Sequence, residues 1–238
     1  MSKGDNLIDY YWKRNFNDKS VVGVSNDLQR NIARTKSGEV VSKAIWNKTL
    51  NYIVNKLTIN KESSILELCC GNGLILGELA PLCKYAVGVD YSSLLLSQFA
   101  EVFKSDNLNL INQDVLDYKI AETTYNSIIL YFSVQHFNER DTFLLISKCI
   151  KALKKKGVML IGDVPDLDKK WHYINKPEYQ IDYFKRVVDF TPKIGYWFQK
   201  DFFKAMNSCF PDTIFEIIEQ PDYQINSDHC FDVLIKKK

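Results

Sequence analysis

The sequence predicts one α/β domain, a doubly wound Rossmann-like sheet with helices on both faces. The first observation is that short apolar runs alternate with helical patterns from Lys61 onward, which favours parallel strands joined by helices. The second is the size of the chain: 238 residues, 46% of them hydrophobic, are enough to bury one continuous core. Repeats and low-complexity tracts are absent from the sequence, so nothing divides it into further units.

Seven segments are rich in apolar residues and short enough to be strands. They are expected at 64–68, 85–90, 107–111, 127–132, 158–162, 213–219 and 230–237. Helices are expected at 40–57, 92–103 and 139–156. Ser92 or Ser93 would cap the second helix, and Lys154-Lys155-Lys156 would end the third, where cations suit the helix dipole.

The flanks of this pattern define the expected organisation. Residues 1–60 form a polar arm and an amphipathic helix, which we expect to act as a lid, and residues 61–238 form the core. Within the core, 163–200 is long, aromatic and hard to assign. A structureless loop of that length is unusual in a compact domain, so we expect an inserted cap over the acceptor site.

Composition excludes several classes of function. A formal net charge of +2 provides no strong field for nucleic acid. No apolar run approaches the roughly 20 residues that span a bilayer, and the polar N-terminus has no signal-peptide core, so we expect a cytoplasmic protein away from membranes. Three histidines and six cysteines without CxxC spacing indicate no metal site.

The stretch "LELCCGNG" is a strand that runs into a glycine turn, as in nucleotide-binding sheets. Gly71 and Gly73 would let the backbone approach a ligand. Asp90 ends the next strand, where a carboxylate can accept hydrogen bonds from both ribose hydroxyls. Asp114 ends the third strand and could meet an adenine amino group. These residues predict a nucleoside site at the carboxyl ends of the strands.

Two residues argue against a dinucleotide in this site. The G-x-G-x-x-G/A fingerprint starting at Gly71 would need glycine or alanine at position 76, where Leu76 stands. Glu67, just before the turn, would repel a pyrophosphate but suits an ammonium group. Ribose, adenine and an ammonium without phosphate point to S-adenosylmethionine, with a nicotinamide oxidoreductase as the weaker alternative.

"LELCCGNG", "VGVDYS", "NQDVLD" and "IILYFSVQHF" resemble, in this order, the motifs of class I S-adenosylmethionine-dependent methyltransferases. The resemblance implies a seven-stranded, mostly parallel sheet with an antiparallel C-terminal strand pair, and S-adenosylhomocysteine as product. It departs from the family at Cys69, which stands where the family has its first glycine. The cofactor-binding residues that the resemblance implies are Glu67, Gly71, Gly73, Asp90, Tyr91, Asp114, Val115, Phe132 and Ser133.

The acceptor is less defined. His136 follows the fourth strand and is the best candidate for a base, the alternative being a structural histidine bonded to backbone; His172 and His229 have weaker claims. The chain lacks the [DN]-P-P-[YF] motif of base amino-methyltransferases, the Pro-Cys nucleophile of cytosine enzymes and the metal-binding acid of catechol-type enzymes. A small soluble acceptor and a metal-independent reaction remain.

The flanks supply further candidates. Tyr11, Trp12, Tyr131 and Tyr196 are expected to bind substrate. Arg34 is expected to hold a carboxylate or a phosphate, with the carboxylate of the cofactor as one candidate, unless it is a solvated surface arginine. Short stretches after 160 resemble methyltransferases of bacterial surface-polysaccharide pathways, which implies a sugar, a sugar nucleotide or a phosphorylated amino alcohol, methylated at O or N. A non-catalytic scaffold that binds S-adenosylmethionine is the alternative.

Overall fold

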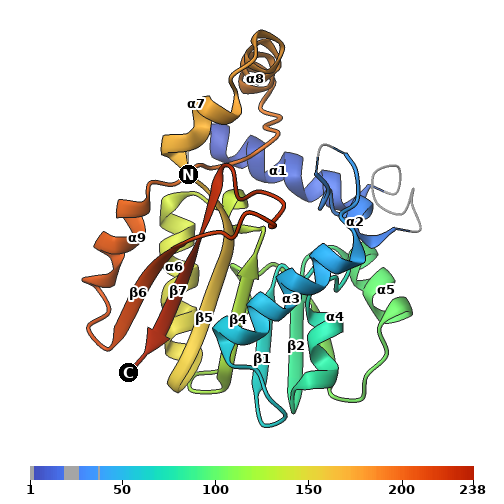
Figure 1. Ribbon diagram of the computed structural model, residues 1–238, viewed down its shortest axis with the longest axis vertical. Coiled ribbons are helices and arrows are strands. Elements are labelled where there is room, and N and C mark those ends of the chain that lie inside the picture. Colours follow the sequence, from blue (N-terminus) through green and yellow to red (C-terminus); the bar gives the residue numbers. More distant parts are fainter. Residues whose placement is uncertain (1–2, 19–26, 37) are drawn as a thin grey trace.

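The computed structural model describes residues 3–18, 27–36 and 38–238, and it contains the predicted seven-stranded sheet (Figure 1). The strand order is β3-β2-β1-β4-β5-β7-β6. The strands are β1 (Ser64–Leu68), β2 (Tyr85–Asp90), β3 (Leu108–Asn112), β4 (Tyr125–Tyr131), β5 (Leu153–Pro165), β6 (Thr213–Glu219) and β7 (Cys230–Lys237). β7 runs antiparallel to both β5 and β6, and the other neighbouring strands of this sheet are parallel. The predicted fold class is therefore confirmed.

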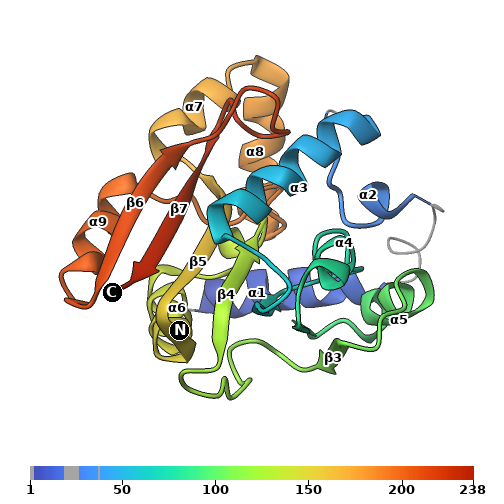
Figure 2. The ribbon, with the colours of Figure 1, turned by 60° about the horizontal axis from the view of Figure 1, so that its bottom comes forward.

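Helices cover both faces of the sheet and bury two apolar cores (Figure 2). One face carries α3 (Lys43–Leu57), α4 (Leu76–Leu79) and α5 (Ser93–Val102). The other carries α6 (Glu139–Ala152) and α9 (Lys200–Asn207). Strand side chains alternate between the faces, as in β4, where Ile128 and Leu130 face the α6 core and Ile129 faces the α3 core.

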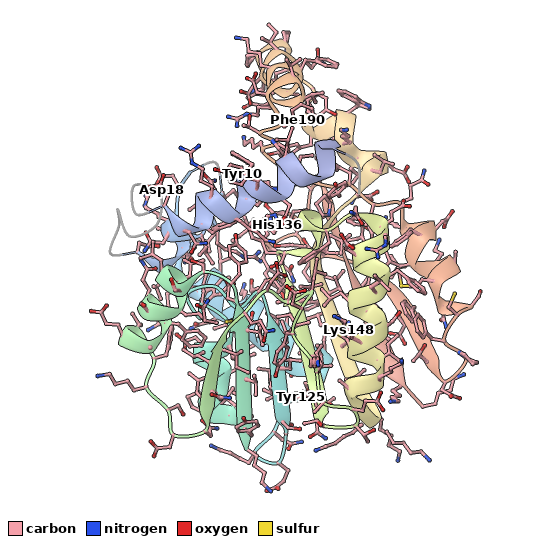
Figure 3. The ribbon with its side chains drawn as sticks, turned by 180° about the vertical axis from the view of Figure 1, so that it is seen from behind. Tyr10, Asp18, Tyr125, His136, Lys148 and Phe190 are labelled. Atoms are coloured by element: carbon pink, nitrogen blue, oxygen red, sulfur yellow. The ribbon has the colours of Figure 1, made fainter. Side chains whose placement is uncertain are left out.

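The remaining helices gather near the carboxyl ends of the parallel strands, where α1 lies across the sheet edge (Figure 3). They are α1 (Lys3–Asn17), α2 (Leu28–Asn31), α7 (Lys170–Tyr173) and α8 (Pro177–Asp189), with 3-10 turns at Ala80–Leu82, Val134–His136 and Leu167–Lys169. Residues 163–200 thus contain two helices and a turn. None of the helices in the described ranges is long and apolar enough to cross a membrane.

Two predicted helix boundaries were wrong. The helix expected at 40–57 begins at Lys43, because Ser42 caps it by accepting a hydrogen bond from the Ile45 N–H at 3.3 Å. The helix expected at 139–156 ends at Ala152. Leu153 is fully buried and opens β5, so the lysines at 154–156 lie in a strand instead of ending a helix. Burial of Leu153 outweighs the helical propensity of the lysines.

Candidate functional site

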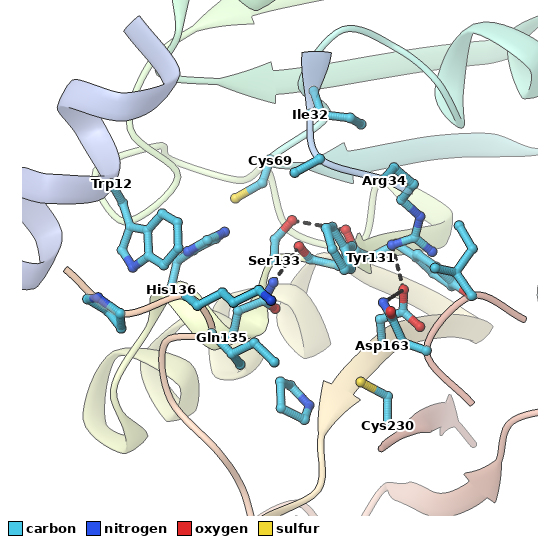
Figure 4. A pocket seen from close by; sticks show the side chains of 18 of the residues that line it. Trp12, Ile32, Arg34, Cys69, Tyr131, Ser133, Gln135, His136, Asp163 and Cys230 are labelled. Atoms are coloured by element: carbon cyan, nitrogen blue, oxygen red, sulfur yellow. Dashed lines mark hydrogen bonds and ion pairs between the residues drawn. The ribbon is translucent and has the colours of Figure 1, made fainter. Parts of the chain in front are cut away.

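A cavity of about 870 Å³ opens at the carboxyl ends of the parallel strands, beneath α1, α7 and α8 (Figure 4). This is the edge at which open α/β sheets bind their ligands. Most of the predicted cofactor residues line it: Arg34, Glu67, Gly71, Asp90, Tyr91, Asp114, Val115, Phe132 and Ser133. Trp12, Tyr131 and His136 also line it.

Asp90 holds the glycine turn in place. Its Oδ2 accepts a hydrogen bond from the Gly71 N–H at 2.9 Å, and its Oδ1 accepts one from the Ser92 N–H at 2.8 Å. Gly71 itself has φ +52, a conformation that glycine adopts without strain. Each carboxylate oxygen retains a free lone pair, so Asp90 can support the turn and still accept ribose hydroxyls.

Glu67 ends β1 beneath this turn and is 3% exposed. Its Oε2 accepts a hydrogen bond from the Leu76 N–H at 3.0 Å, at the start of α4. Burial raises the pKa of Glu67 well above its ordinary range. A cation in the cavity would restore its charge, so this carboxylate is suited to an ammonium group.

Two residues of the turn, Cys69 and Gly73, differ from what the glycine motif led us to expect. Cys69 adopts φ +56, the left-handed conformation that explains why the resembled family has glycine there. Gly73, at φ +78, is not among the residues that line the cavity. A Cβ on Gly73 would lie 2.3 Å from the ring of Phe99, so this glycine makes room for α5 packing, and its contact with the cofactor stays a prediction.

Asp114 lies at the opposite end of the cofactor residues and is tied to α1. It forms an ion pair with Lys13 at 2.7 Å, and its Oδ1 accepts a hydrogen bond from the Leu116 N–H at 2.9 Å. Two further bonds hold α1 over the strands. The Tyr91 hydroxyl donates to the Trp12 carbonyl at 3.0 Å, and the Ser92 hydroxyl donates to the Phe16 carbonyl at 2.6 Å.

Arg34 is buried, so its interpretation as a solvated surface arginine was wrong. Its side chain is 3% exposed and forms an ion pair with Asp163 at 2.5 Å (Figure 4). The guanidinium lies over the rings of Phe132 and Tyr131, 4.3 and 4.7 Å from their centroids. Its Nε has no hydrogen-bond partner in the part of the chain that the structure describes. A buried donor of this kind is available to an anionic group in the cavity.

The segment after β4 forms the wall between the two halves of the cavity. Phe132 has φ +58 and its N–H donates to the Gly162 carbonyl at 2.9 Å. The Ser133 hydroxyl donates to the Tyr131 carbonyl at 2.9 Å, and the Tyr131 hydroxyl donates to Gln224 at 2.9 Å. The hydroxyls of Tyr131 and Ser133 are therefore engaged within the protein, and these residues present mainly their carbon surfaces.

His136 lies under α1 at this wall. The Trp12 ring meets its imidazole edge-on at 4.5 Å, and Phe16 lies 5.8 Å away. Its backbone N–H bonds to the Ser133 carbonyl, but its Nδ1 has no partner among the residues the structure describes. Burial lowers the pKa of His136 to about 4. The imidazole is neutral at physiological pH, and none of the carboxylates in the described part of the chain pairs with it.

Two predicted substrate residues are not among those lining the cavity, so their role stays a prediction. Tyr11 precedes Trp12 on α1 and is turned by one helical step from it. Tyr196 packs against the core beside α6 and bonds through its N–H to the Gln135 carbonyl at 2.8 Å.

Sequence reasoning gave His229 only a weak claim as a base and did not bring it together with the other members of an acceptor-side cluster. Asp163, Tyr173, Trp197, Asp228 and His229 all line the cavity. The only signal for Asp163 was its place directly after a predicted strand, in "LIGDVP". The others are brought together by tertiary structure. Within the described ranges, no group of three or more His, Cys, Asp or Glu side chains is arranged to hold a metal ion.

Comparison with known proteins agrees with this geometry. A family described as "Methyltransferase domain" matches residues 65–157, which include the glycine turn and the ends of β1, β2 and β4. An uncharacterized methyltransferase of Schizosaccharomyces pombe is 28% identical over 121 residues, covering 47% of this chain and 42% of that protein. Residues 65–157, which are 93 of the 238 residues, are thus similar to a methyltransferase domain. The class I family that the sequence motifs resemble uses S-adenosylmethionine as its cofactor, which leaves as S-adenosylhomocysteine.

Other similarities are more distant. A chondramide synthase of Chondromyces crocatus is 26% identical over 151 residues, 59% of this chain and 4% of the synthase. The chain thus spans less than half the length of these two curated relatives. Among solved structures, the methyltransferase NodS of Bradyrhizobium japonicum, with S-adenosylhomocysteine, has a TM-score of 0.58 at 12% identity and 98% coverage of both chains. The plantazolicin methyltransferase BpumL, also with S-adenosylhomocysteine, has a TM-score of 0.61 at 13% identity and 98% coverage of both. At these identities the structural likeness concerns the fold.

The cavity residues fit the methyltransferase cofactor. Glu67 is a buried carboxylate whose charge an ammonium would restore, and Arg34 has an unpartnered donor suited to a carboxylate. Asp90 ends β2 and Asp114 lies two residues beyond the end of the adjacent β3, so both carboxylates are at the strand ends where ribose and adenine bind in such sheets. The volume of about 870 Å³ lies within the range of small-molecule sites.

Proposed function

We propose that the protein transfers a methyl group from S-adenosylmethionine to an oxygen or nitrogen of a small polar metabolite. The observation that supports this most is the continuity of one cavity. Its one half is lined by Glu67, Asp90 and Asp114, and its other half by aromatic side chains beyond Phe132 and Ser133. A cofactor in the first half would present its reactive end to an acceptor in the second.

Within this proposal, the chain's own residues bind and orient. Glu67 takes the ammonium, Arg34 the carboxylate and Asp90 the ribose, while Val115 and Asp114 contact the adenine edge. Tyr91 holds α1 through the Trp12 carbonyl, and α1 acts as the lid that excludes water. The cofactor supplies an electrophilic methyl group, and the protein's main contribution is to place the acceptor in line with it.

The finer proposal concerns the acceptor. A sugar, a sugar nucleotide or a phosphorylated amino alcohol, as in surface-polysaccharide pathways, fits a cavity with aromatic rings and with Arg186 and Lys193 at its rim. Arg186 is paired with Asp182 at 2.8 Å, so Lys193 is the cation that favours an acceptor carrying an anionic group. Residues 163–200, which supply these side chains, act as the acceptor-site cap. A cytoplasmic location and independence from nucleic acid and metal complete the proposal as predictions.

His136 keeps its sequence-based role as a proton acceptor only as a prediction. A base works best with a pKa near the operating pH, whereas burial lowers the pKa of His136 to about 4. Trp12 and Phe16 surround the ring with apolar surface, which opposes an imidazolium. These surroundings favour a role in shaping the cavity.

The test mixes the purified protein with methyl-¹³C S-adenosylmethionine and a metabolite extract of its native host, followed by mass spectrometry. A labelled small molecule supports the proposal, provided that an Asp90→Ala variant forms much less of it. Cofactor binding without any labelled product would favour the non-catalytic scaffold. Label confined to macromolecules would contradict a small acceptor.

A further inference from the structure

His229 lies at the edge of the sheet where the cavity opens, because of the direction in which β7 runs. It immediately precedes β7, and β7 runs antiparallel to β5, so its first residues lie beside the carboxyl end of β5. The pairing of Cys230 with Pro165 fixes this position. Figure 4 shows Cys230 near Asp163 at the floor of the cavity.

The backbone around His229 is bonded on both sides. The Asp166 N–H donates to the His229 carbonyl at 2.9 Å, and the His229 N–H donates to the Asn226 carbonyl at 3.0 Å. The residue is 6% exposed, which leaves the ring little freedom. Such a residue holds one orientation without help from a ligand.

The imidazole itself is fixed by two further contacts. Its Nδ1 lies 2.7 Å from Oδ1 of Asp228, and its face stacks on the ring of Tyr173, with centroids 4.2 Å apart and 29° between the planes. Trp197 flanks the same ring at 6.1 Å. All four side chains line the cavity.

A carboxylate at Nδ1 selects the tautomer. Because Asp228 is an acceptor, the proton of the neutral ring resides on Nδ1, and the lone pair resides on Nε2. No hydrogen bond to Nε2 is formed by the residues described in the structure. Nε2 is therefore an unengaged proton acceptor on a residue of the cavity wall. His136 lacks a carboxylate partner of this kind.

We propose that His229, held by Asp228 and Tyr173, is the general base of this site and that the acceptor atom is a hydroxyl oxygen. The proposal rests on the proposed function. As the oxygen forms its bond to the methyl carbon, the carbon–sulfur bond breaks toward sulfur, and the hydroxyl proton moves to Nε2. The negative charge of Asp228 stabilises the imidazolium that forms. The imidazolium then returns its proton to solvent. A hydroxyl needs such a base at the moment of attack, whereas an amine need only lose a proton.

The first measurement is the tautomer of His229 by long-range ¹H–¹⁵N NMR of histidine-labelled protein. The chain contains three histidines, so His→Asn variants assign every signal. Near neutral pH, His229 should carry its proton on Nδ1, and Asp228→Asn should shift the population toward the other tautomer. A wild-type ring protonated on Nε2 alone would overturn the base role without any need for an acceptor.

The second measurement uses methyl-¹³C S-adenosylmethionine with host metabolite extract as the probe. The ¹³C shift of the transferred methyl group should identify a methyl ether. His229→Asn, which keeps a polar atom toward Asp228 but lacks Nε2, should lower its formation about 10²–10⁴-fold while S-adenosylhomocysteine affinity is unchanged. His172→Asn is the matched comparison: His172 also lines the cavity, but the described residues give it no hydrogen bond and no carboxylate partner, so by this proposal its replacement does not remove the base.

The outcomes separate this proposal from the proposed function. A methylamine product, or a methyl ether formed equally well by His229→Asn, contradicts the base while leaving methyl transfer intact. If the wild type labels nothing, the proposed function fails and the base role fails with it, whatever tautomer is observed.

Discussion

Replacing Asp232 by asparagine should make the protein's stability less dependent on pH. Asp232 is completely buried behind the cavity. Its Oδ2 accepts a hydrogen bond from the Tyr52 hydroxyl at 2.8 Å, and its Oδ1 accepts bonds from Gln220 Nε2 at 2.6 Å and from the Asp163 N–H at 2.9 Å. Asp163 is a second buried carboxylate beside Asp232, and its negative charge is balanced by an ion pair with Arg34.

The sign and size of the effect follow from the pKa. Burial first, and repulsion by Asp163 second, raise the pKa of Asp232 from 3.8 to about 6. The folded state therefore binds this proton more tightly than the unfolded state, so the group favours folding at low pH and this advantage disappears as pH rises toward about 6. The full difference is about 3 kcal/mol, of which about 1.4 kcal/mol falls between about pH 5 and about pH 8.

The assay is urea unfolding of wild type and Asp232→Asn at about pH 5 and about pH 8. The other titratable groups are the same in both proteins, so their contributions to the free energy of unfolding cancel when the two are compared. The free energy of unfolding of the variant, minus that of the wild type, should rise by about 1.4 kcal/mol over this interval. Asp168→Asn, at an exposed carboxylate, is the control and should give a constant difference. A constant difference for Asp232→Asn as well would refute the reasoning.

Three further substitutions test the site. Asp90→Ala should weaken S-adenosylhomocysteine binding by about 1.5–3 kcal/mol in calorimetry, because it loses charge-assisted bonds; unchanged affinity would exclude a ribose contact. Gly73→Ala should lower the free energy of unfolding by about 1–3 kcal/mol, since the new Cβ meets Phe99, and a Phe99→Leu background should recover part of the loss. His136→Ala should retain S-adenosylhomocysteine affinity and most of its turnover; a 10²–10⁴-fold fall in turnover would instead return the base role to His136.

The strands, and the residues that line the cofactor half of the cavity, could be predicted because each is marked by a short local sequence pattern. Buried strands in a parallel sheet are apolar on both faces, so runs such as "SILEL" stand out from the helices around them. Asp90 is the last residue of β2 and Asp114 lies two residues after β3, so strand position alone places them at the ligand edge. The same logic placed Glu67 before the glycine turn.

The errors arose where tertiary packing decides the local structure. The helix that was extended to 156 has good helix formers at its end, but the burial of Leu153 draws the chain into β5. Arg34 lies in a polar segment whose composition is typical of a surface, and only the fold reveals Asp163 and the two aromatic rings around it.

The sequence named His229 as a weak candidate but could not show which residues surround it in the acceptor half, for a topological reason. His229 is adjacent to a predicted strand, but sequence does not tell which end of the sheet that strand begins at. The antiparallel direction of β7 brings His229 to the ligand edge, and α7, more than fifty residues earlier, supplies Tyr173. Residues that meet in this way share no spacing that a sequence pattern could reveal.

The charge of the cofactor half suits the chemistry proposed for it. Backbone N–H groups, which are dipoles without net charge, hold Glu67, Asp90 and Asp114. Apart from Lys13, which reaches Asp114 from α1, no lysine or arginine among the described residues forms an ion pair with these three carboxyl groups. A sulfonium and an ammonium are attracted to such a field. Methyl transfer removes the sulfonium charge and so weakens this attraction, and the carboxylates that favour binding of the cofactor therefore also favour release of the product.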